Sequence, residues 1–203
     1  MSIVLVGSTS GSCTLQEQAV AGTTVLTLPT TSGTLITTGS SGQSIPKAAL
    51  PTGSVLQVNT TTKSDTFSST TTNAWTDITG LTVSITPTSS SSKIMIFCSV
   101  QGVNNNTNAY FRLVRGATAI GVGDAAGSRS QVSSSNIAGV NGNSMWGSSF
   151  QFLDSPATTS STTYKVQFIT DGATTYVNRT HTDDNALYTG RSQSTITVME
   201  ISA

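Results

Sequence analysis

Regular alternation of apolar and polar residues predicts that most of this chain folds as β-strands. The pattern is clearest over residues 148–170, where one segment alternates around Phe150 and Phe152 and a second around Tyr164 and Phe168. A period of two places one row of side chains on each face of a strand. A turn rich in Ser and Thr separates the two segments. We therefore expect a hairpin-like pair of strands, each of which buries an aromatic row.

The same pattern recurs along residues 54–203 and predicts about ten strands without a helix. The other strands are expected at 54–59, 74–78, 81–86, 93–101, 109–115, 118–122, 174–179 and 193–201. Strand 93–101 is apolar on both faces, which predicts a central strand covered on both sides. Strands 109–115 and 118–122 are expected to form a hairpin around Arg115 and Gly116.

This strand pattern predicts an all-β fold built as an antiparallel β-sandwich. A jelly-roll order is favoured because the last strand, 193–201, is as apolar as a central one. An immunoglobulin-type sandwich is the alternative, but the chain lacks the Cys, Trp and Cys spacing that supports it. We call residues 54–203 the knob, and residues 43–53, which contain two prolines, the linker.

Residues 1–42, which we call the arm, have a different pattern. Gly11, Gly22 and Gly33 recur every eleven residues, and short stretches of Thr and aliphatic residues follow them. Gly, Thr and Val are poor helix formers, so short extended strands are expected. Such strands bury little by themselves, and other copies or another protein must cover them. The predicted anchoring residues are Leu15, Val25, Leu26, Leu28, Leu35 and Ile36.

Composition and charge narrow the range of partners. The 203 residues include nine basic and nine acidic side chains, and only 9% are charged. A neutral surface does not attract nucleic acid or an anionic membrane, so neither is expected as a partner. The first residues lack the features of a signal peptide or a membrane span, so synthesis in a cytoplasm is expected. Cys13 and Cys98 imply no disulfide framework, and Cys98 is expected to be a buried apolar residue.

The sequence offers little catalytic or metal-binding chemistry. His181 is the single histidine, and Asp183 and Asp184 are too close along one loop to orient its ring reliably. Asp183 and Asp184, together with Asn185 and Asp171, supply oxygen atoms of the kind that bind calcium. The sequence contains no calcium-binding spacing. No pair of acids suggests a glycosidase. We therefore predict no catalytic residue, no metal site and no cofactor.

Recognition is expected at the loops, because a rigid sandwich commonly presents its contacts there. The loop at residues 104–108 and the long glycine-rich and serine-rich loop at 123–142 are the main candidates. Aromatic residues of the strands are expected mostly in the core or at an interface between copies. The predicted binding residues are Asn104, Asn105, Asn106, Asn108 and Trp146.

Four stretches of the knob resemble a known family of proteins. They are ITGLTVSITPTSSSSKIMI (78–96), RLVRGATAIGVG (112–123), FLDSPATTSSTTYKVQF (152–168) and STITVMEI (194–201). Together they resemble the C-terminal knob of bacteriophage virion proteins, often described as tail-fibre or structural proteins, of phages that infect cyanobacteria and marine bacteria. Within the arm, residues 7–39 are similar to the strand-rich repeat that precedes such knobs.

The resemblance implies a homotrimeric jelly-roll head, similar to the heads of tumour necrosis factor and complement C1q, on the virion surface. Its implied partners are sister copies and, through the arm, the major capsid protein or another virion protein; a host surface glycan is a further candidate. Tail fibres usually carry a larger adaptor and shaft, so the short arm favours a capsid decoration (cement) protein over a tail-fibre tip. A third class, a glycan-binding or glycan-hydrolysing module, would show an aromatic-lined groove with paired acids.

Overall fold

The structure is a computed structural model that describes residues 3–6, 12–15, 50–105, 107–134, 138–139 and 142–203. The chain divides into two compact units, residues 1–44 and 45–203. In the first unit, β1 (Ile3–Val6) pairs antiparallel with β2 (Ser12–Leu15), with Ile3 opposite Leu15. Leu15 therefore ends a strand. The other predicted anchoring residues, Val25, Leu26, Leu28, Leu35 and Ile36, lie outside the described residues.

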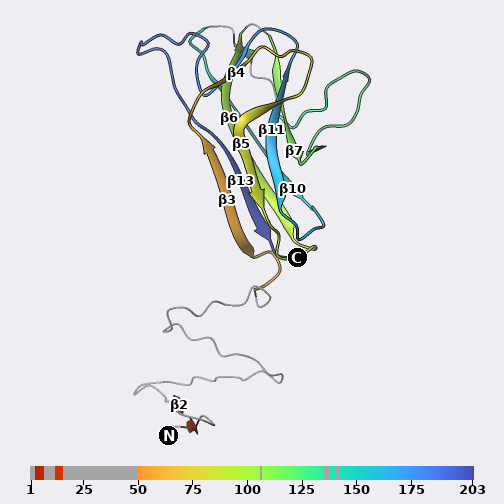
Figure 1. Ribbon diagram of the computed structural model, residues 1–203, viewed down its shortest axis with the longest axis vertical. Helices are drawn as coiled ribbons and strands as arrows, with labels where there is room; N and C mark the ends of the chain where they lie inside the picture. The colour runs from red at the N-terminus through yellow and green to blue at the C-terminus, as the bar shows by residue number, and fades with distance from the viewer. Residues whose placement is uncertain (1–2, 7–11, 16–49, 106, 135–137, 140–141) are drawn as a thin grey trace, which may run out of the picture. The chain divides into compact units, whose positions relative to one another are not determined.

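Every regular element described in the second unit is a β-strand, as the alternation predicted (Figure 1). The strands are β3 (Val55–Lys63), β4 (Phe67–Ser69), β5 (Thr76–Ile85), β6 (Lys93–Asn105), β7 (Ala109–Arg115), β8 (Thr118–Ile120), β9 (Ala138–Gly139), β10 (Trp146–Asp154), β11 (Thr162–Thr170), β12 (Thr175–Val177) and β13 (Ser194–Ile201). The expected hairpin of β7 and β8 is confirmed, with Arg115 opposite Thr118.

These strands form two sheets in which all pairs but one are antiparallel. In the first sheet, β3, β13, β6 and β10 run side by side. The short β12 also pairs with β6, beyond the end of β13, and the short β4 pairs with β12. The exception is β9, which pairs parallel with the end of β6. The second sheet has the order β5, β11, β7, β8. β3 thus pairs with β13, β5 with β11, β6 with β10, and β7 with β8.

The core lies between the two sheets, and its buried apolar side chains come mainly from β5, β6, β7, β11 and β13. Phe67 of the first sheet meets Phe168 of the second edge to face, with 6.0 Å between ring centroids. The fold is therefore a β-sandwich. Its fully buried large side chains are Leu81, Ile85, Ile94, Ile96, Val100, Phe111, Leu113, Tyr164, Phe168 and Ile196, with the carboxylate of Glu200.

The expected hairpin over residues 148–170 is wrong. β10 pairs with β6 in the first sheet, whereas β11 lies between β5 and β7 in the second. The segment between them crosses from one sheet to the other. The alternation correctly predicted which side chains are buried, since Tyr164 and Phe168 are fully buried and Phe150 and Phe152 pack against the core. Alternation defines the faces of a strand but does not identify its neighbours.

Two expected short strands, 74–78 and 81–86, are in fact the single strand β5. Gly80 lies inside it with a φ of +84°, a conformation that glycine adopts easily. A Cβ added at this glycine would lie 3.5 Å from the ammonium nitrogen of Lys63, which is itself buried. Thr79 and Gly80 therefore bend a continuous strand rather than join two strands.

A buried carboxylate links the two sheets where β10 ends. Asp154 Oδ2 accepts a hydrogen bond of 2.7 Å from the hydroxyl of Tyr164 on β11. Nη1 of Arg115, at the end of β7, lies 2.8 Å from both carboxylate oxygens. Burial raises the pKa of Tyr164 above its ordinary value, and the hydrogen bond to Asp154 raises it further. The phenol hydrogen is therefore held tightly in the folded state.

This raised pKa predicts a loss of stability in alkaline solution. The unfolded chain releases the Tyr164 proton at about pH 10, whereas the folded chain retains it. The contribution of Tyr164 to the free energy of unfolding is therefore fully present below about pH 10. Above pH 10 it falls by up to about 1.4 kcal/mol per pH unit. In urea titrations at several pH values, Tyr164→Phe should show a shallower alkaline fall than the wild type. Equal slopes in the wild type and in Tyr164→Phe would contradict this interpretation.

Candidate functional site

The outer surface of the first sheet is the clearest candidate for a contact surface. Ile94, Ile96, Cys98 and Val100 of β6 point into the core, so the residues between them point away from the second sheet. We call this surface the outer β6 face. It consists of Val58, Thr60 and Thr62 of β3, Thr195, Thr197 and Met199 of β13, Met95, Phe97 and Ser99 of β6, and Ser149, Gln151 and Leu153 of β10.

The strand registers arrange these side chains in three rows across the sheet. The first row is entirely apolar and the second contains one aromatic ring, whereas the third carries only hydroxyl groups. In order across β3, β13, β6 and β10, the rows are Val58, Met199, Met95, Leu153; Thr60, Thr197, Phe97, Gln151; and Thr62, Thr195, Ser99, Ser149. None of these side chains is charged.

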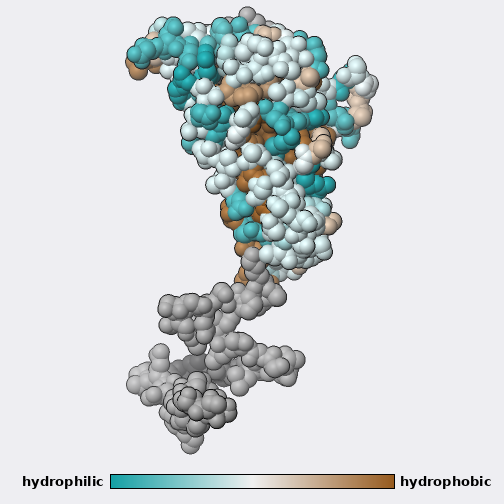
Figure 2. Space-filling model, in the orientation of Figure 1, coloured by the Kyte–Doolittle hydropathy of each residue, from teal (hydrophilic) through white to brown (hydrophobic). Residues whose placement is uncertain are grey.

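Large apolar side chains on this face remain exposed. Val58 is 51% exposed, Leu153 47% and Phe97 39%. The sequence predicted that β6 would be covered on both sides, but within the described residues its outer side has no cover. Figure 2 shows hydrophobic residues reaching the surface at the lower left of the knob, where β3 begins. An exposed apolar surface of this kind is a candidate for contact with a partner.

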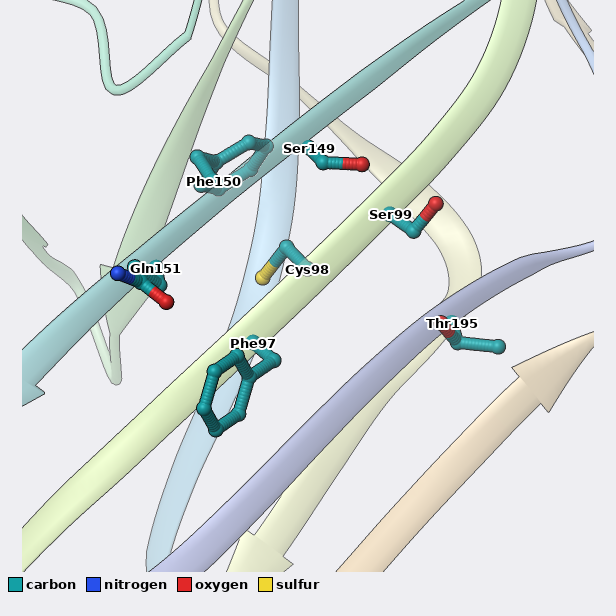
Figure 3. Close-up of a pocket in the computed structure, with 7 residues that line it drawn as sticks. All are labelled: Phe97, Cys98, Ser99, Ser149, Phe150, Gln151 and Thr195. Atoms are coloured by element: carbon teal, nitrogen blue, oxygen red, sulfur yellow. The ribbon is translucent and has the colours of Figure 1, made fainter.

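A shallow hollow of about 450 Å³ opens on the same face (Figure 3). The hollow forms because Ser99, Ser149 and Thr195 have short side chains. The larger side chains of Phe97 and Gln151 line its edge. Cys98 lies beneath it, and burial raises the pKa of its thiol to about 12. The expectation that Cys98 is a buried apolar residue is confirmed, since it is only 4% exposed.

Strand β3 has the reverse of the usual polarity. Its valine Val58 points outward, whereas Gln57 and Asn59 point toward the second sheet. Their amide nitrogens donate to backbone carbonyls beside the edge strand β5, over 2.7 Å to Thr86 and 2.8 Å to Ser84. Polar groups thus close the sandwich at this corner while apolar groups face out. Val58 therefore adds an exposed apolar side chain to the outer β6 face.

Among the predicted binding residues, Asn104 is buried and cannot meet a ligand from solvent. Its Nδ2 donates to the hydroxyls of Thr170 and Thr175, over 3.1 and 2.9 Å, and its Oδ1 accepts from the backbone and hydroxyl of Thr107. The hydroxyl of Thr107 also lies within hydrogen-bonding distance of the carbonyl of Gly172. Asn104 therefore fixes a loop rather than presenting one. Asparagine is common in both roles, and the sequence contains no signal that separates them.

The remaining predicted binding residues are distributed around the same end of the knob. Asn105 is half-buried at the end of β6, and Trp146 is 50% exposed where β10 begins, opposite Gly102. The backbone nitrogen of Asn108 donates to Asp171 over 3.3 Å. Asn106 lies outside the described residues. Asn105, Asn106, Asn108 and Trp146 remain predictions as binding residues.

The loop that carries His181 is organised by arginines. Asp183 contacts Arg179 at 3.2 Å and Arg191 at 2.8 Å. The ring of His181 lies 5.4 Å from that of Tyr176, and the guanidinium of Arg179 covers the same tyrosine ring. The carboxylate of Asp183 is thus used to hold two loop segments together. Within the described residues, no group of three His, Cys, Asp or Glu side chains could hold a metal ion.

The described part of the chain contains no helix long and apolar enough to cross a membrane. Comparison with models of known protein families and with curated proteins gives no match.

The hydrogen bonds of Asn104 predict that its replacement destabilises the knob. Asn104→Ala should lower the free energy of unfolding by about 3 kcal/mol, because several buried polar groups lose their partner. Asn105→Ala, at the half-buried neighbouring position, should cost about 0.5 kcal/mol or less. Urea unfolding at pH 7 measures both, and equal costs would show that the network around Asn104 contributes little.

Proposed function

We propose that this chain is a non-enzymatic structural protein of a bacteriophage virion. In this proposal three copies assemble through their knobs, the arm binds the particle, and the knobs are exposed on the virion surface. The observation that carries the proposal is the outer β6 face of the β-sandwich, which is uncharged and exposes a row of apolar side chains. The resemblance of the knob to phage virion proteins supplies the biological setting.

The strand order supports a jelly roll. Taken in chain order, the strands β3, β5, β6, β7, β8, β10, β11 and β13 pair first with last, second with seventh, third with sixth and fourth with fifth. This nesting is what results when one long hairpin is rolled into two facing sheets, and jelly rolls consist of eight such strands. It also leaves the last strand, β13, inside the sheet between β3 and β6. This position agrees with its apolar sequence.

The chemistry of the outer β6 face favours sister copies as its cover. The chain has no net charge, so copies do not repel one another. Interfaces between identical subunits are more apolar than the remaining surface and poor in charge at their centre. The face also carries both a projecting ring, Phe97, and a hollow lined by Ser99, Ser149 and Thr195. If the ring of one copy enters the hollow of the next, the contact is head-to-tail, and three copies can close into a ring.

The arm is the proposed attachment to the particle. The described hairpin of β1 and β2 has only two strands, and an isolated two-stranded hairpin is at best marginally stable in water. Addition of its strands to the edge of a sheet in the major capsid protein would satisfy its backbone groups. We therefore favour capsid decoration, in which the arm stabilises the shell. A tail-fibre tip, with the arm wound into a threefold shaft, is the alternative.

Self-association through the outer β6 face is tested with Leu153→Glu. Three glutamates would be buried in an uncharged interface, which should raise the dissociation constant at least about 1000-fold, or about 4 kcal/mol. In sedimentation at micromolar concentration the wild type should be a trimer and the variant a folded monomer. Thr79→Glu places the same charge at an exposed position of β5 and should remain trimeric. A monomeric wild type, or a trimeric Leu153→Glu, would contradict the proposal.

The role of the arm is tested separately in the full chain. Replacement of both Leu26 and Leu35 by Asp should abolish co-sedimentation with phage particles stripped of the protein, because a charge cannot be buried against the particle without a partner. The protein should still be a trimer. Replacement of Thr24 and Thr34 by Asp adds the same charge at polar positions and should preserve most of the binding. Undiminished binding of the leucine variant would exclude these residues as anchors.

A further inference from the structure

The outer surface of the second sheet carries a cluster of polar and aromatic side chains that the proposed assembly does not use. The cluster consists of Trp75, which precedes β5, Asp77 of β5, Arg112 of β7, and Lys165 and Gln167 of β11. It lies on the sheet opposite the outer β6 face, so association through that face leaves it exposed. We call it the Trp75–Arg112 cluster.

The guanidinium group of Arg112 is held flat in this cluster. Its Cζ lies 4.1 Å from the centroid of the Trp75 ring. Its Nε donates to Oε1 of Gln167 over 2.8 Å. Because β11 lies between β5 and β7, the side chains of Trp75 and Arg112 meet over the outer surface of β11. Stacking and the single Nε bond fix the plane of the guanidinium, which prepares it to bind a carboxylate through two parallel hydrogen bonds.

The other members of the cluster form a continuous chain of hydrogen bonds. Nε2 of Gln167 donates to Oδ1 of Asp77 over 2.7 Å, and Nζ of Lys165 donates to Oδ2 over 2.7 Å. Asp77 thereby orients both Gln167 and Lys165. Its side chain is still 50% exposed, and each carboxylate oxygen can accept a second hydrogen bond from a ligand hydroxyl.

The hydrogen-bonding groups of the cluster that remain unused are mostly donors, which suit an anion. Within the described residues, the hydrogen bonds of Arg112 use only Nε, and its two terminal nitrogens have no hydrogen-bond partner. Two cations, Arg112 and Lys165, surround one carboxylate, so the cluster has a net charge of +1 on a molecule with none. Tyr110 lies on the same face of β7, two residues from Arg112, and is half-buried like Trp75.

We infer that the Trp75–Arg112 cluster binds an acidic saccharide, such as a uronic acid unit of a surface glycan. The sugar carboxylate pairs with the terminal nitrogens of Arg112, and a ring hydroxyl donates to Asp77. The exposed parts of Tyr110 and Trp75 contact the apolar side of the sugar ring, which favours a sugar over a simple anion. Because the cluster lies on the second sheet, its binding of a saccharide does not depend on trimer formation.

The test uses the full-length protein and the indole N–H signals of its two tryptophans in NMR spectra. Sodium glucuronate is titrated in, with glucose as the uncharged control and sodium acetate as the carboxylate without a ring. Glucuronate should shift the signal of Trp75 in a saturable way and leave that of Trp146 unchanged. Arg112→Gln should weaken this response at least tenfold. Arg129→Gln removes an exposed arginine of the 123–142 loop and should respond like the wild type.

Two further variants separate recognition from folding. Arg112→Lys keeps the charge but lacks the planar pair of donors, so it should bind glucuronate several-fold more weakly while its unfolding midpoint stays close to that of the wild type. Lys165→Gln should weaken binding less than Arg112→Gln does. The inference is overturned if glucuronate causes no saturable shift. It is also overturned if Arg112→Gln responds like the wild type, or if acetate reproduces the response in full.

Discussion

The need to bury a second side of β6 is the constraint on which this account depends. A strand inside a sandwich normally has one face in the core and one in water, and the outer residues are then polar. β6 instead places Met95 and Phe97 outward, and its neighbours continue this apolar surface with Met199 and Leu153. We propose that this sheet is covered on both sides. The second sheet supplies one cover, and in our proposal sister copies supply the other.

The polar groups of the molecule are placed where they allow this arrangement. Glu200 points inward from β13 and is fully buried although its side chain is a carboxylate. It is stabilised there by Gln57 Nε2 at 2.6 Å and by the backbone and hydroxyl of Thr88, each at 2.6 Å. These hydrogen bonds lower its pKa, although burial acts in the opposite direction. Charged and amide groups at the corner between β3 and β5 are therefore satisfied within the knob, and the outer β6 face can remain uncharged.

The sequence predicted the fold class well, because alternation depends on local geometry that each strand displays by itself. Tyr164 and Phe168 are buried as the pattern indicated. It could not show that β10 and β11 belong to different sheets, since a connection of a few residues suits both a hairpin and a crossing. The pattern also predicted two strands, 74–78 and 81–86, where the structure has the single strand β5, with Gly80 inside it at a positive φ. Pairing depends on distant residues, which local patterns do not contain.

The candidate sites were harder to predict because side-chain partners come from strands far apart in sequence. Nothing near Asn104 reveals that it would bond to Thr170 and Thr175, and nothing near Arg112 reveals that its guanidinium would lie over Trp75. The outer β6 face did have a signal, namely the apolar residues on both faces of strand 93–101. That signal predicted cover on both sides of the strand, and in our proposal other copies supply the outer cover.

The most direct test of the account is the rate at which peroxide oxidises each methionine in the native protein. Met95 and Met199 lie in the outer β6 face, and Met145 lies outside it and serves as an internal reference. If sister copies cover the face, oxidation of Met95 and Met199 should slow at least about tenfold as the protein concentration rises through the range of association, while Met145 is unaffected. Rates for Met95 and Met199 that stay fast and independent of concentration would contradict the account.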